Sequence, residues 1–308
     1  MQKLTPCLWF DNNAEEAMNF YVSVFKDSKI NHIDYYPDES LDEHFKGMSG
    51  KVINGEFELS GHPFICLDGG PLFNLNSSIS FILNFDPSMG GNAAKTIEEY
   101  WHKLSENGRV LMPFQEYPFS KKYGWIQDKY GVTWQLMTTD PAGEDRPFIT
   151  PSLMFAGQKT NRAEEAIDFY TSVFLNSQKG SLAHYTEDSG TAKKGSLMFG
   201  DFRLNGTWMA AMDSSVEQDV TFNEAISLTI DCQDQAELGY YWERLSAVPE
   251  AEQCGWCKDK FGVSWQIIPR RLNELLTDKD KAAAGRAMQA MMKMHKLDVA
   301  ELEKAFNG

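Results

Sequence analysis

The sequence is poor in positive charge and has no long apolar run. It holds 29 Lys and Arg against 44 Asp and Glu, a formal net charge of −15. Nucleic acids and anionic membranes attract proteins through clustered basic residues, so this balance argues against both as partners. No apolar stretch approaches the roughly 20 residues that a membrane-spanning helix needs.

Cysteine is also scarce: five residues are an odd number for a disulfide framework. The first residues, MQKLTPCLWF, lack the layout of a secretory signal. Both observations favour the cytoplasm, where thiols stay reduced. Cys254 and Cys257 have the spacing of a redox pair, but they precede a predicted strand and not a helix, so we expect neither redox chemistry nor zinc there.

What the sequence does contain is an internal repeat. Residues 123–136 read YGWIQDKYGVTWQL and residues 254–267 read CGWCKDKFGVSWQI, with eight of fourteen positions identical. Self-similarity on this scale indicates two copies of one module. The expected domains are 1–139 and 149–270, a Pro- and Gly-containing linker at 140–148, and a tail at 271–308.

Hydrophobic periodicity gives the elements within each copy. Residues 4–10 and 78–85 alternate in polarity, which predicts half-buried strands. Residues 14–25 and 92–107 have apolar positions at helical spacing, and Asp11-Asn12-Asn13 is expected to cap the first helix. With a hairpin at 51–68, the order is strand, helix, three strands. The predicted fold class is α+β, built from tandem βαβββ modules.

The tail has no counterpart in the first half. Met288, Met291 and Met292 have helical spacing, and Asp298 with Glu301 forms a capping box for a final helix. Methionines suit an adaptable contact surface. Two alternatives stay open: the tail packs on its own domain, or it crosses to a partner subunit in a homodimer.

Three motifs in order, TPxLxF, AEEAxxFYxSVF and GWxxDxxGxxWQ, resemble those of PhnB-like proteins over nearly the whole chain. These belong to the vicinal oxygen chelate group, with glyoxalase I, bleomycin-resistance proteins and extradiol dioxygenases. The resemblance implies curved mixed sheets with helices on the convex side and a cavity on the concave side. Members are often labelled 3-demethylubiquinone-9 3-methyltransferase. This sequence has no Gly-rich strand-turn-helix loop for a nucleotide-type methyl donor, so we do not expect that activity.

In the metal-dependent members, His and Glu side chains on the concave face hold a divalent ion. The resemblance places one Glu position at Gln135 and again at Gln266, and it places His positions at or near Thr5, Thr150 and the serines of 78–80. A neutral amide is a weak ligand for such an ion. We therefore expect no metal site and no cofactor.

Strand alternation turns polar but uncharged side chains toward the cavity. The predicted ligand-binding residues are Thr5, Cys7, Trp9, Ser80, Thr133 and Gln135 from the first half, and Ser152, Ser227, Thr229 and Gln266 from the second. Aromatic walls with a few hydrogen-bonding groups are typical of a small-molecule pocket. The sequence favours a binding protein of the bleomycin-resistance kind for an unidentified small molecule. The alternative is an enzyme of the same group with an unidentified small substrate and unidentified catalytic residues.

Overall fold

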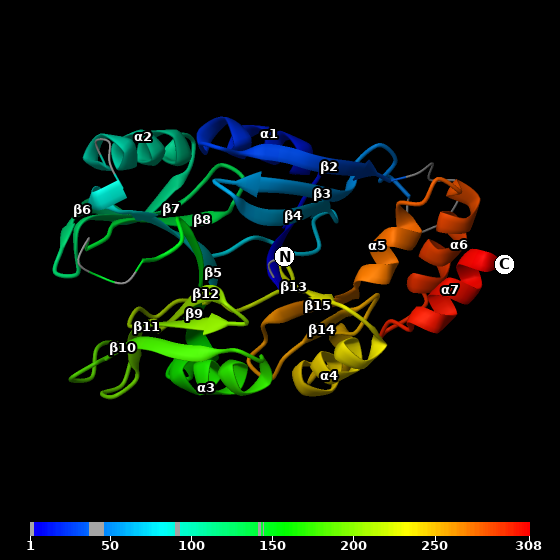
Figure 1. Ribbon diagram of the computed structural model, residues 1–308. Coiled ribbons are helices and arrows are strands. Elements are labelled where there is room, and N and C mark those ends of the chain that lie inside the picture. The colour runs from blue at the N-terminus through cyan, green and yellow to red at the C-terminus, as the bar shows by residue number, and fades with distance from the viewer. Residues whose placement is uncertain (1–2, 37–45, 90–92, 141–142, 144) are drawn as a thin grey trace. The chain divides into compact units, whose positions relative to one another are not determined.

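The computed structural model describes residues 3–36, 46–89, 93–140, 143 and 145–308 (Figure 1). The linker predicted at 140–148 lies partly outside these residues. By its internal contacts the chain divides into two compact units, one formed by Cys7–Thr221 and one by Met1–Pro6 with Phe222–Gly308.

Strand β1 (Leu4–Phe10) begins in the smaller unit and ends in the larger one. The larger unit continues with α1 (Ala14–Val24), β2 (Lys29–Tyr35), β3 (Val52–Leu59), β4 (His62–Asp68), β5 (Ile79–Phe85), η3 (Pro87–Met89), α2 (Ala93–Ser105), β6 (Arg109–Tyr117), β7 (Ser120–Gln127), β8 (Thr133–Thr138), β9 (Ile149–Phe155), η4 (Gly157–Lys159), α3 (Ala163–Val173), β10 (Gln178–His184), β11 (Leu197–Leu204) and β12 (Thr207–Asp213). The smaller unit holds β13 (Ile226–Cys232), α4 (Gln235–Leu245), η5 (Pro249–Ala251), β14 (Trp256–Lys258), β15 (Ser264–Pro269), α5 (Arg270–Leu276), α6 (Lys281–Met291) and α7 (Val299–Asn307).

The strands form two mixed sheets. One has eight strands in the order β10-β11-β12-β9-β5-β8-β7-β6, all within the larger unit, and the other has seven in the order β14-β15-β13-β1-β4-β3-β2. The eight-stranded sheet therefore joins β5–β8 of the first repeat to β9–β12 of the second. The seam is the antiparallel pair β5–β9, in which Ser80 lies opposite Ser152. The predicted α+β class is confirmed.

Helices α2 and α3 cover one face of the eight-stranded sheet (Figure 1). Trp134 on β8 points to this side and is fully buried, with ring centroids 5.5 Å from Tyr21, 5.1 Å from Phe25 and 5.3 Å from Phe81. Burying aromatic side chains of this size is the main source of core stability. This packing fixes which side of β8 faces away from the helices.

The start of α1 differs from the expectation. Asn13 makes no side-chain capping hydrogen bond, and the backbone N–H of Ala14 instead donates to Asp68 Oδ1 at 2.9 Å. The second repeat does the same, because Asp213 Oδ1 accepts from Ala163 at 3.1 Å. A carboxylate at the end of a neighbouring strand satisfies the helix N-terminus in place of a local cap.

The last module has one strand fewer than predicted. After α4 it continues with η5, β14 and β15, whereas the first repeat has β6, β7 and β8. Tail residues occupy the outer edge of this segment: Cys254 N–H donates to the Met294 carbonyl and Gly255 N–H to the His295 carbonyl, both at 2.8 Å. An exposed strand edge is satisfied in this way by the chain's own tail.

The tail therefore packs within its own unit, and α5, α6 and α7 lie together (orange to red in Figure 1). Helix α6 ends at Met291, and the chain beyond it bonds through Met294 and His295 to the residues before β14. Asp298 caps the last helix as predicted, since Glu301 N–H donates to Asp298 Oδ1 at 3.0 Å, which is one of the two bonds of the predicted capping box. Homodimerisation stays a prediction.

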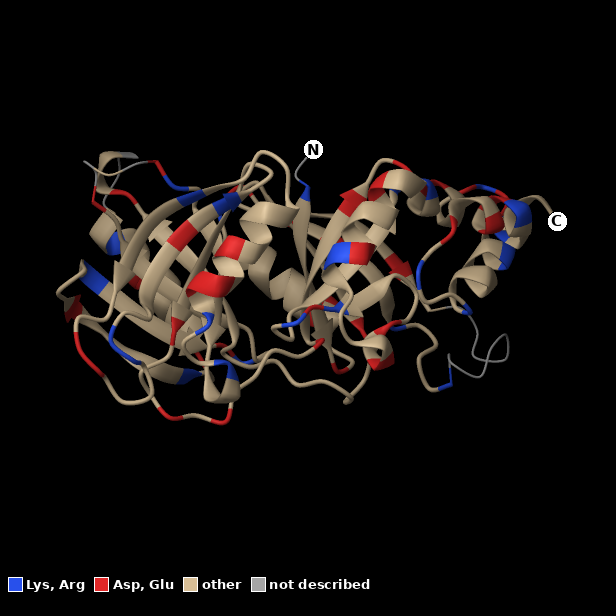
Figure 2. Ribbon diagram, turned by 90° about the horizontal axis from the view of Figure 1, so that it is seen from below, with Lys and Arg blue, Asp and Glu red and all other residues tan. Residues whose placement is uncertain are grey.

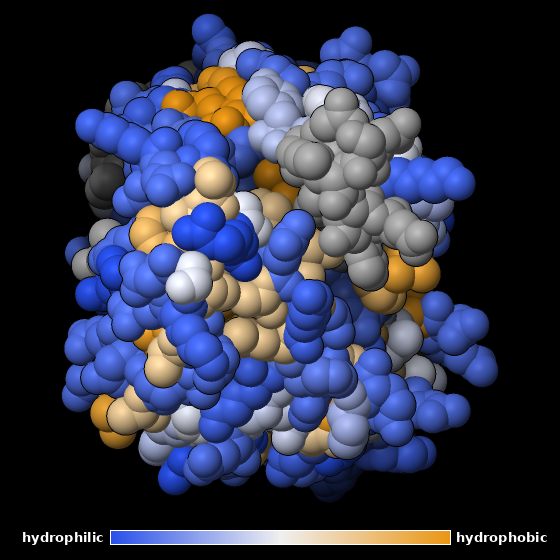
Figure 3. Space-filling model, turned by 90° about the vertical axis from the view of Figure 1, so that its right-hand side faces the viewer, coloured by the Kyte–Doolittle hydropathy of each residue, from blue (hydrophilic) through white to orange (hydrophobic). Residues whose placement is uncertain are grey.

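The distribution of charged residues over the structure agrees with the acidic composition of the sequence. Basic residues are scattered among acidic ones (Figure 2). The face drawn in Figure 3 is mainly hydrophilic, with separate smaller hydrophobic patches. Among the residues described, no helix is both long and apolar enough to cross a membrane.

Candidate functional site

The eight-stranded sheet has a second face, turned away from α2 and α3, which we call the inner face. Strand pairing identifies its residues: Gln135 on β8 lies opposite Trp125 on β7. Ser80 on β5 lies opposite Ser152 on β9, which in turn pairs with Ala210 on β12. These positions alternate with the buried residues that contact the helices, such as Trp134, so all five face the same side.

A short hydrogen-bonded chain crosses the inner face. The Tyr123 hydroxyl donates to Gln135 Oε1, and Gln135 Nε2 donates to Ser80 Oγ, each at 2.8 Å. None of the three side chains is more than 5% exposed. Burial raises the pKa of Tyr123, so its hydroxyl stays protonated and remains a donor. This bond fixes the orientation of the Gln135 amide.

Two buried polar atoms on the inner face have no hydrogen-bond partner among the described residues: Ser152 Oγ and Trp125 Nε1. Ser152 is completely buried and Trp125 is 7% exposed. Leaving a buried donor or acceptor unsatisfied costs about 1–3 kcal/mol. Such groups in folded proteins are nearly always satisfied by protein, water or a ligand.

Part of the inner face is apolar and adaptable. Tyr123, Trp125, Met154 and Ala156 form one buried cluster, which connects β7 with β9. Partly buried side chains pack around it: Leu111, Met112, Tyr117, Met137, Met212 and Val220. Thioethers fill irregular space and make favourable contacts with aromatic rings. The cluster is thus the apolar, polarisable part of the inner face.

One end of the inner face is charged. Arg146, from the segment that joins the repeats, bonds to Asp201 Oδ2 at 2.7 Å, and its guanidinium lies 3.9 Å from the Trp208 ring centroid. The guanidinium of Arg203 lies 4.1 Å from the same ring. Stacking on the indole and bonding to a carboxylate hold these long side chains in place. The end formed by β11 and β12 therefore differs in character from the centre.

The structure divides the predicted site residues between the two sheets. Ser80, Thr133, Gln135 and Ser152 share the inner face, although the prediction grouped them by repeat. Pairing of β5 with β9 brings the two repeats together there. The Thr133 hydroxyl donates a hydrogen bond to the Ile79 carbonyl at 3.1 Å.

The other predicted residues belong to the seven-stranded sheet. In the larger unit, Trp9 donates its indole N–H to the Gly70 carbonyl at 2.8 Å, and Cys7 is buried. The remaining predicted positions, Thr5, Ser227, Thr229 and Gln266, are in the smaller unit. Gln266 Nε2 donates to Ser227 Oγ at 2.9 Å, which repeats the pair at Gln135 and Ser80.

Sequence reasoning missed Tyr123 and Trp125. Both lie in the repeated motif and alternate with Gly124, which the Trp101 ring covers on the helix side. The same period-2 pattern that assigned Gln135 would have placed them on the inner face. Their face becomes evident once residues 120–127 are recognised as a strand.

The inner face does not fit the divalent ion of the metal-dependent relatives. Gln135, at the position expected for Glu, is bonded to the hydroxyls of Tyr123 and Ser80, and all three side chains are neutral. A divalent ion in a buried site needs anionic or imidazole ligands. Within the residues that the structure describes, no three His, Cys, Asp or Glu side chains gather at one point.

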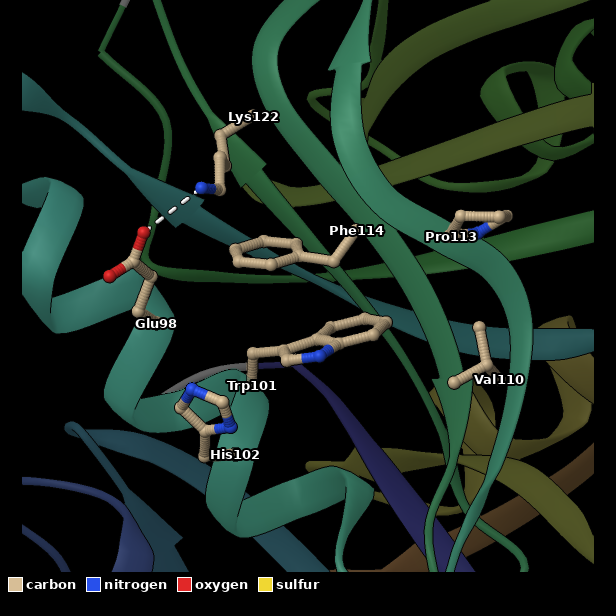
Figure 4. Close-up of a pocket in the computed structure, with 7 residues that line it drawn as sticks. All are labelled: Glu98, Trp101, His102, Val110, Pro113, Phe114 and Lys122. Carbon is tan, nitrogen blue, oxygen red and sulfur yellow. Dashed lines mark hydrogen bonds and ion pairs between the residues drawn. The ribbon is translucent and has the colours of Figure 1, made fainter.

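A separate groove lies on the outer side of the sheet, between α2 and the hairpin of β6 and β7 (Figure 4). Its lining residues are Glu98, Trp101, His102, Val110, Pro113, Phe114 and Lys122. Trp101 stacks on Phe114 with centroids 4.6 Å apart, and Lys122 bonds to Glu98 at 2.9 Å. These side chains contact one another across the groove, and the groove lies on the face opposite to Gln135.

A comparison with protein-family models finds the same family in both halves of the chain. The family model for 3-demethylubiquinone-9 3-methyltransferase matches residues 2–137 and again 147–268. A solved structure from Bacillus cereus, described as a putative 3-demethylubiquinone-9 3-methyltransferase, PhnB protein, is 38% identical. That match covers 45% of this chain and 100% of that chain, with a TM-score of 0.39.

Two longer solved structures are similar along most of the chain. Glyoxalase I from Zea mays is 12% identical over 85% of this chain and 92% of that chain, with a TM-score of 0.48. A putative dioxygenase from Bacillus subtilis is 11% identical over 97% of this chain and 94% of that chain, with the same TM-score of 0.48. No curated protein matches the sequence. Because the family model matches both halves, the chain belongs to the 3-demethylubiquinone-9 3-methyltransferase (PhnB-like) family.

Proposed function

We propose that the protein binds a small, largely apolar molecule on the inner face of its eight-stranded sheet, without a metal ion. The observation that carries the proposal is the pair of buried, unpartnered polar atoms, Ser152 Oγ and Trp125 Nε1, on one face. A ligand that bonded to both would remove their desolvation penalty. Most of the remaining contact would come from the cluster around Met154.

Binding is a better match to these groups than catalysis. The central side chains are an amide, two hydroxyls, a phenol held neutral and an indole, which offer hydrogen bonds and no charge. General acid–base chemistry near neutral pH needs a group whose pKa lies close to that pH. This favours sequestration or transport of a molecule, in the manner of a bleomycin-resistance protein, over its conversion.

Methionine methyl NMR tests the proposal directly. A fragment library is screened against protein labelled at its methionine methyl groups. Binders are expected to shift the signals of Met112, Met137, Met154 and Met212, which surround the site, and to leave the tail signals of Met288 and Met291 in place. Mass spectrometry of each binder after incubation separates binding from the alternative of an enzyme.

A blocking variant with a matched control sharpens the test. Met212→Trp adds bulk at the edge of the inner face and should abolish binding. Met198→Trp places the same change on an exposed position, 47% accessible, of the neighbouring strand and should leave binding intact. The proposal fails if no fragment moves the four site methyls, or if Met212→Trp binds the hits as tightly as the wild type does.

A further inference from the structure

The geometry of the inner face points to a class of ligand. We infer that the site takes an uncharged, planar molecule that places a carbonyl oxygen between the indole N–H of Trp125 and the hydroxyl of Ser152. This inference rests on the proposed binding function and adds to it the chemistry by which the ligand is selected.

The first step is the hydrogen-bonding character of the unpartnered atoms. An indole nitrogen can only donate, so whatever satisfies Trp125 must be an acceptor. Ser152 can donate to the same acceptor. A third donor is directly opposite, because Ser80 Oγ accepts from Gln135 Nε2 and keeps its own proton to give. These three donors and the fixed amide all lie on the inner face, and the inferred ligand oxygen binds among them.

The second step is the neutrality of the three central strands, since the charged side chains Arg146, Asp201 and Arg203 lie at the end of the inner face formed by β11 and β12. The inner-face positions of β5, β8 and β9 are all non-ionisable: Ser80, Ile82 and Asn84; Thr133, Gln135 and Met137; Thr150, Ser152 and Met154. An anion buried among neutral groups pays most of its desolvation cost without a counter-charge. The ketone, quinone or amide type of oxygen, which is a strong acceptor but carries no charge, fits the donors better than a carboxylate does.

The third step is the shape of the lining. The rings of Tyr123 and Trp125 share one cluster with the Met154 thioether, and Met137 and Met212 pack against it. Aromatic faces and sulfur atoms gain most from contact with another flat π-system. A conjugated carbonyl compound provides both the flat surface and the acceptor in one molecule.

Three compounds of the same tricyclic shape separate these features: 9-fluorenone has the carbonyl, fluorene lacks it, and fluorene-2-carboxylate carries an anion. Dissociation constants are measured by titration calorimetry, and the site is located by the methyl signals of Met112 and Met154. We expect 9-fluorenone to bind about 10- to 100-fold tighter than fluorene, because fluorene leaves one or two buried donors unsatisfied. The carboxylate should bind more weakly than the ketone.

Two variants test whether the Ser152 hydroxyl and the Trp125 indole cause the preference for the ketone over fluorene. Ser152→Ala and Trp125→Phe should each reduce the ketone's advantage to about threefold or less. Ser172→Ala, an exposed serine on α3, should leave it unchanged. Ser152→Ala removes one oxygen, whereas Trp125→Phe also removes buried ring volume, so folding is checked by the retained methyl spectrum of the free protein.

The outcomes distinguish the class of ligand from the function. Fluorene binding as tightly as 9-fluorenone, with shifts at Met154, would overturn the carbonyl inference and leave the binding function standing. A carboxylate that binds tightest would overturn the requirement for a neutral ligand. If none of the three compounds binds while library fragments do, the class is wrong. If no fragment binds either, the proposed function falls with it.

Discussion

Replacing Asp128 by Asn tests how far the repeated turn depends on one buried carboxylate. Asp128 is 4% exposed and accepts four hydrogen bonds, two at each oxygen. Oδ1 accepts the backbone N–H groups of Tyr130 at 2.9 Å and Val132 at 3.1 Å, and Oδ2 accepts the hydroxyl of Tyr21 at 2.8 Å and the indole of Trp134 at 2.7 Å. The carboxylate thus connects the turn, α1 and the core.

An amide has only one acceptor oxygen. If that oxygen keeps the backbone donors of the turn, the NH₂ group faces Tyr21 and Trp134. The Tyr21 hydroxyl can rotate and accept a hydrogen bond, but the Trp134 indole can only donate. One buried donor without an acceptor costs about 1–3 kcal/mol, so we expect Asp128→Asn to lower the free energy of unfolding by about 2 kcal/mol at pH 7.

The effect should depend on pH. Burial raises the pKa of Asp128 to about 6, above its ordinary value of 3.8. Because the folded-state pKa is the higher one, ionisation of Asp128 costs stability above pH 6, and this cost disappears as the pH falls toward 4. Asn has no such titration. The advantage of the wild type over the variant should therefore grow by up to about 3 kcal/mol between pH 7 and pH 4.

Urea unfolding at pH 7 and at pH 5, followed by tryptophan fluorescence, measures both quantities. Asp27→Asn is the control, since Asp27 is exposed and has a φ of 50°, which Asn adopts readily. The reasoning is refuted if Asp128→Asn stays within about 0.5 kcal/mol of this control. A difference between wild type and variant that is the same at both pH values would refute the pKa shift alone.

Three further outcomes are expected. Ser152→Ala should leave the free energy of unfolding unchanged or slightly higher, whereas Ser80→Ala should lower it by about 1–3 kcal/mol in urea titrations, because it strands a buried amide donor. Burial raises the pKa of the Cys257 thiol, so the native protein should react slowly with a disulfide reagent at pH 7.4 and rapidly once unfolded; fast native labelling of this residue would contradict the packing. Removing residues 293–308 should lower the melting temperature in calorimetry, because Gly255 and its neighbour lose their backbone acceptors; an unchanged melting temperature would show that the tail does not support this edge.

Local pattern was enough to predict several elements and the two faces of β8. Alternation along residues 132–137 correctly places Trp134 in the core and Gln135 on the opposite face. The hairpin at 51–68 forms as β3 and β4, with Ser60 and Gly61 at positive φ in its turn. These features depend on neighbours within a few residues, which is the range over which periodicity and turn chemistry act.

Features that depend on distant residues could not be predicted. Nothing local to Ser80 and Ser152 indicates that their strands pair, so the candidate site was assigned repeat by repeat. The helix cap supplied by Asp68 comes from 54 residues away along the chain. The absence of a strand before β14 could not be predicted either. The residues that bond there instead, near Met294, lie in a tail without a counterpart in the first repeat.

The seam between β5 and β9 has a consequence for how this site can evolve. Ser80 and Ser152 face each other across the seam, yet β8 presents Gln135 opposite Ile82, one inner-face position beyond Ser80, whereas β12 presents Ala210 directly opposite Ser152. Two identical chains related by a twofold axis would have to present the same residue on both sides. A tandem chain is free of that constraint. One half can carry a long polar side chain where the other carries a small one, so the inner face can be asymmetric.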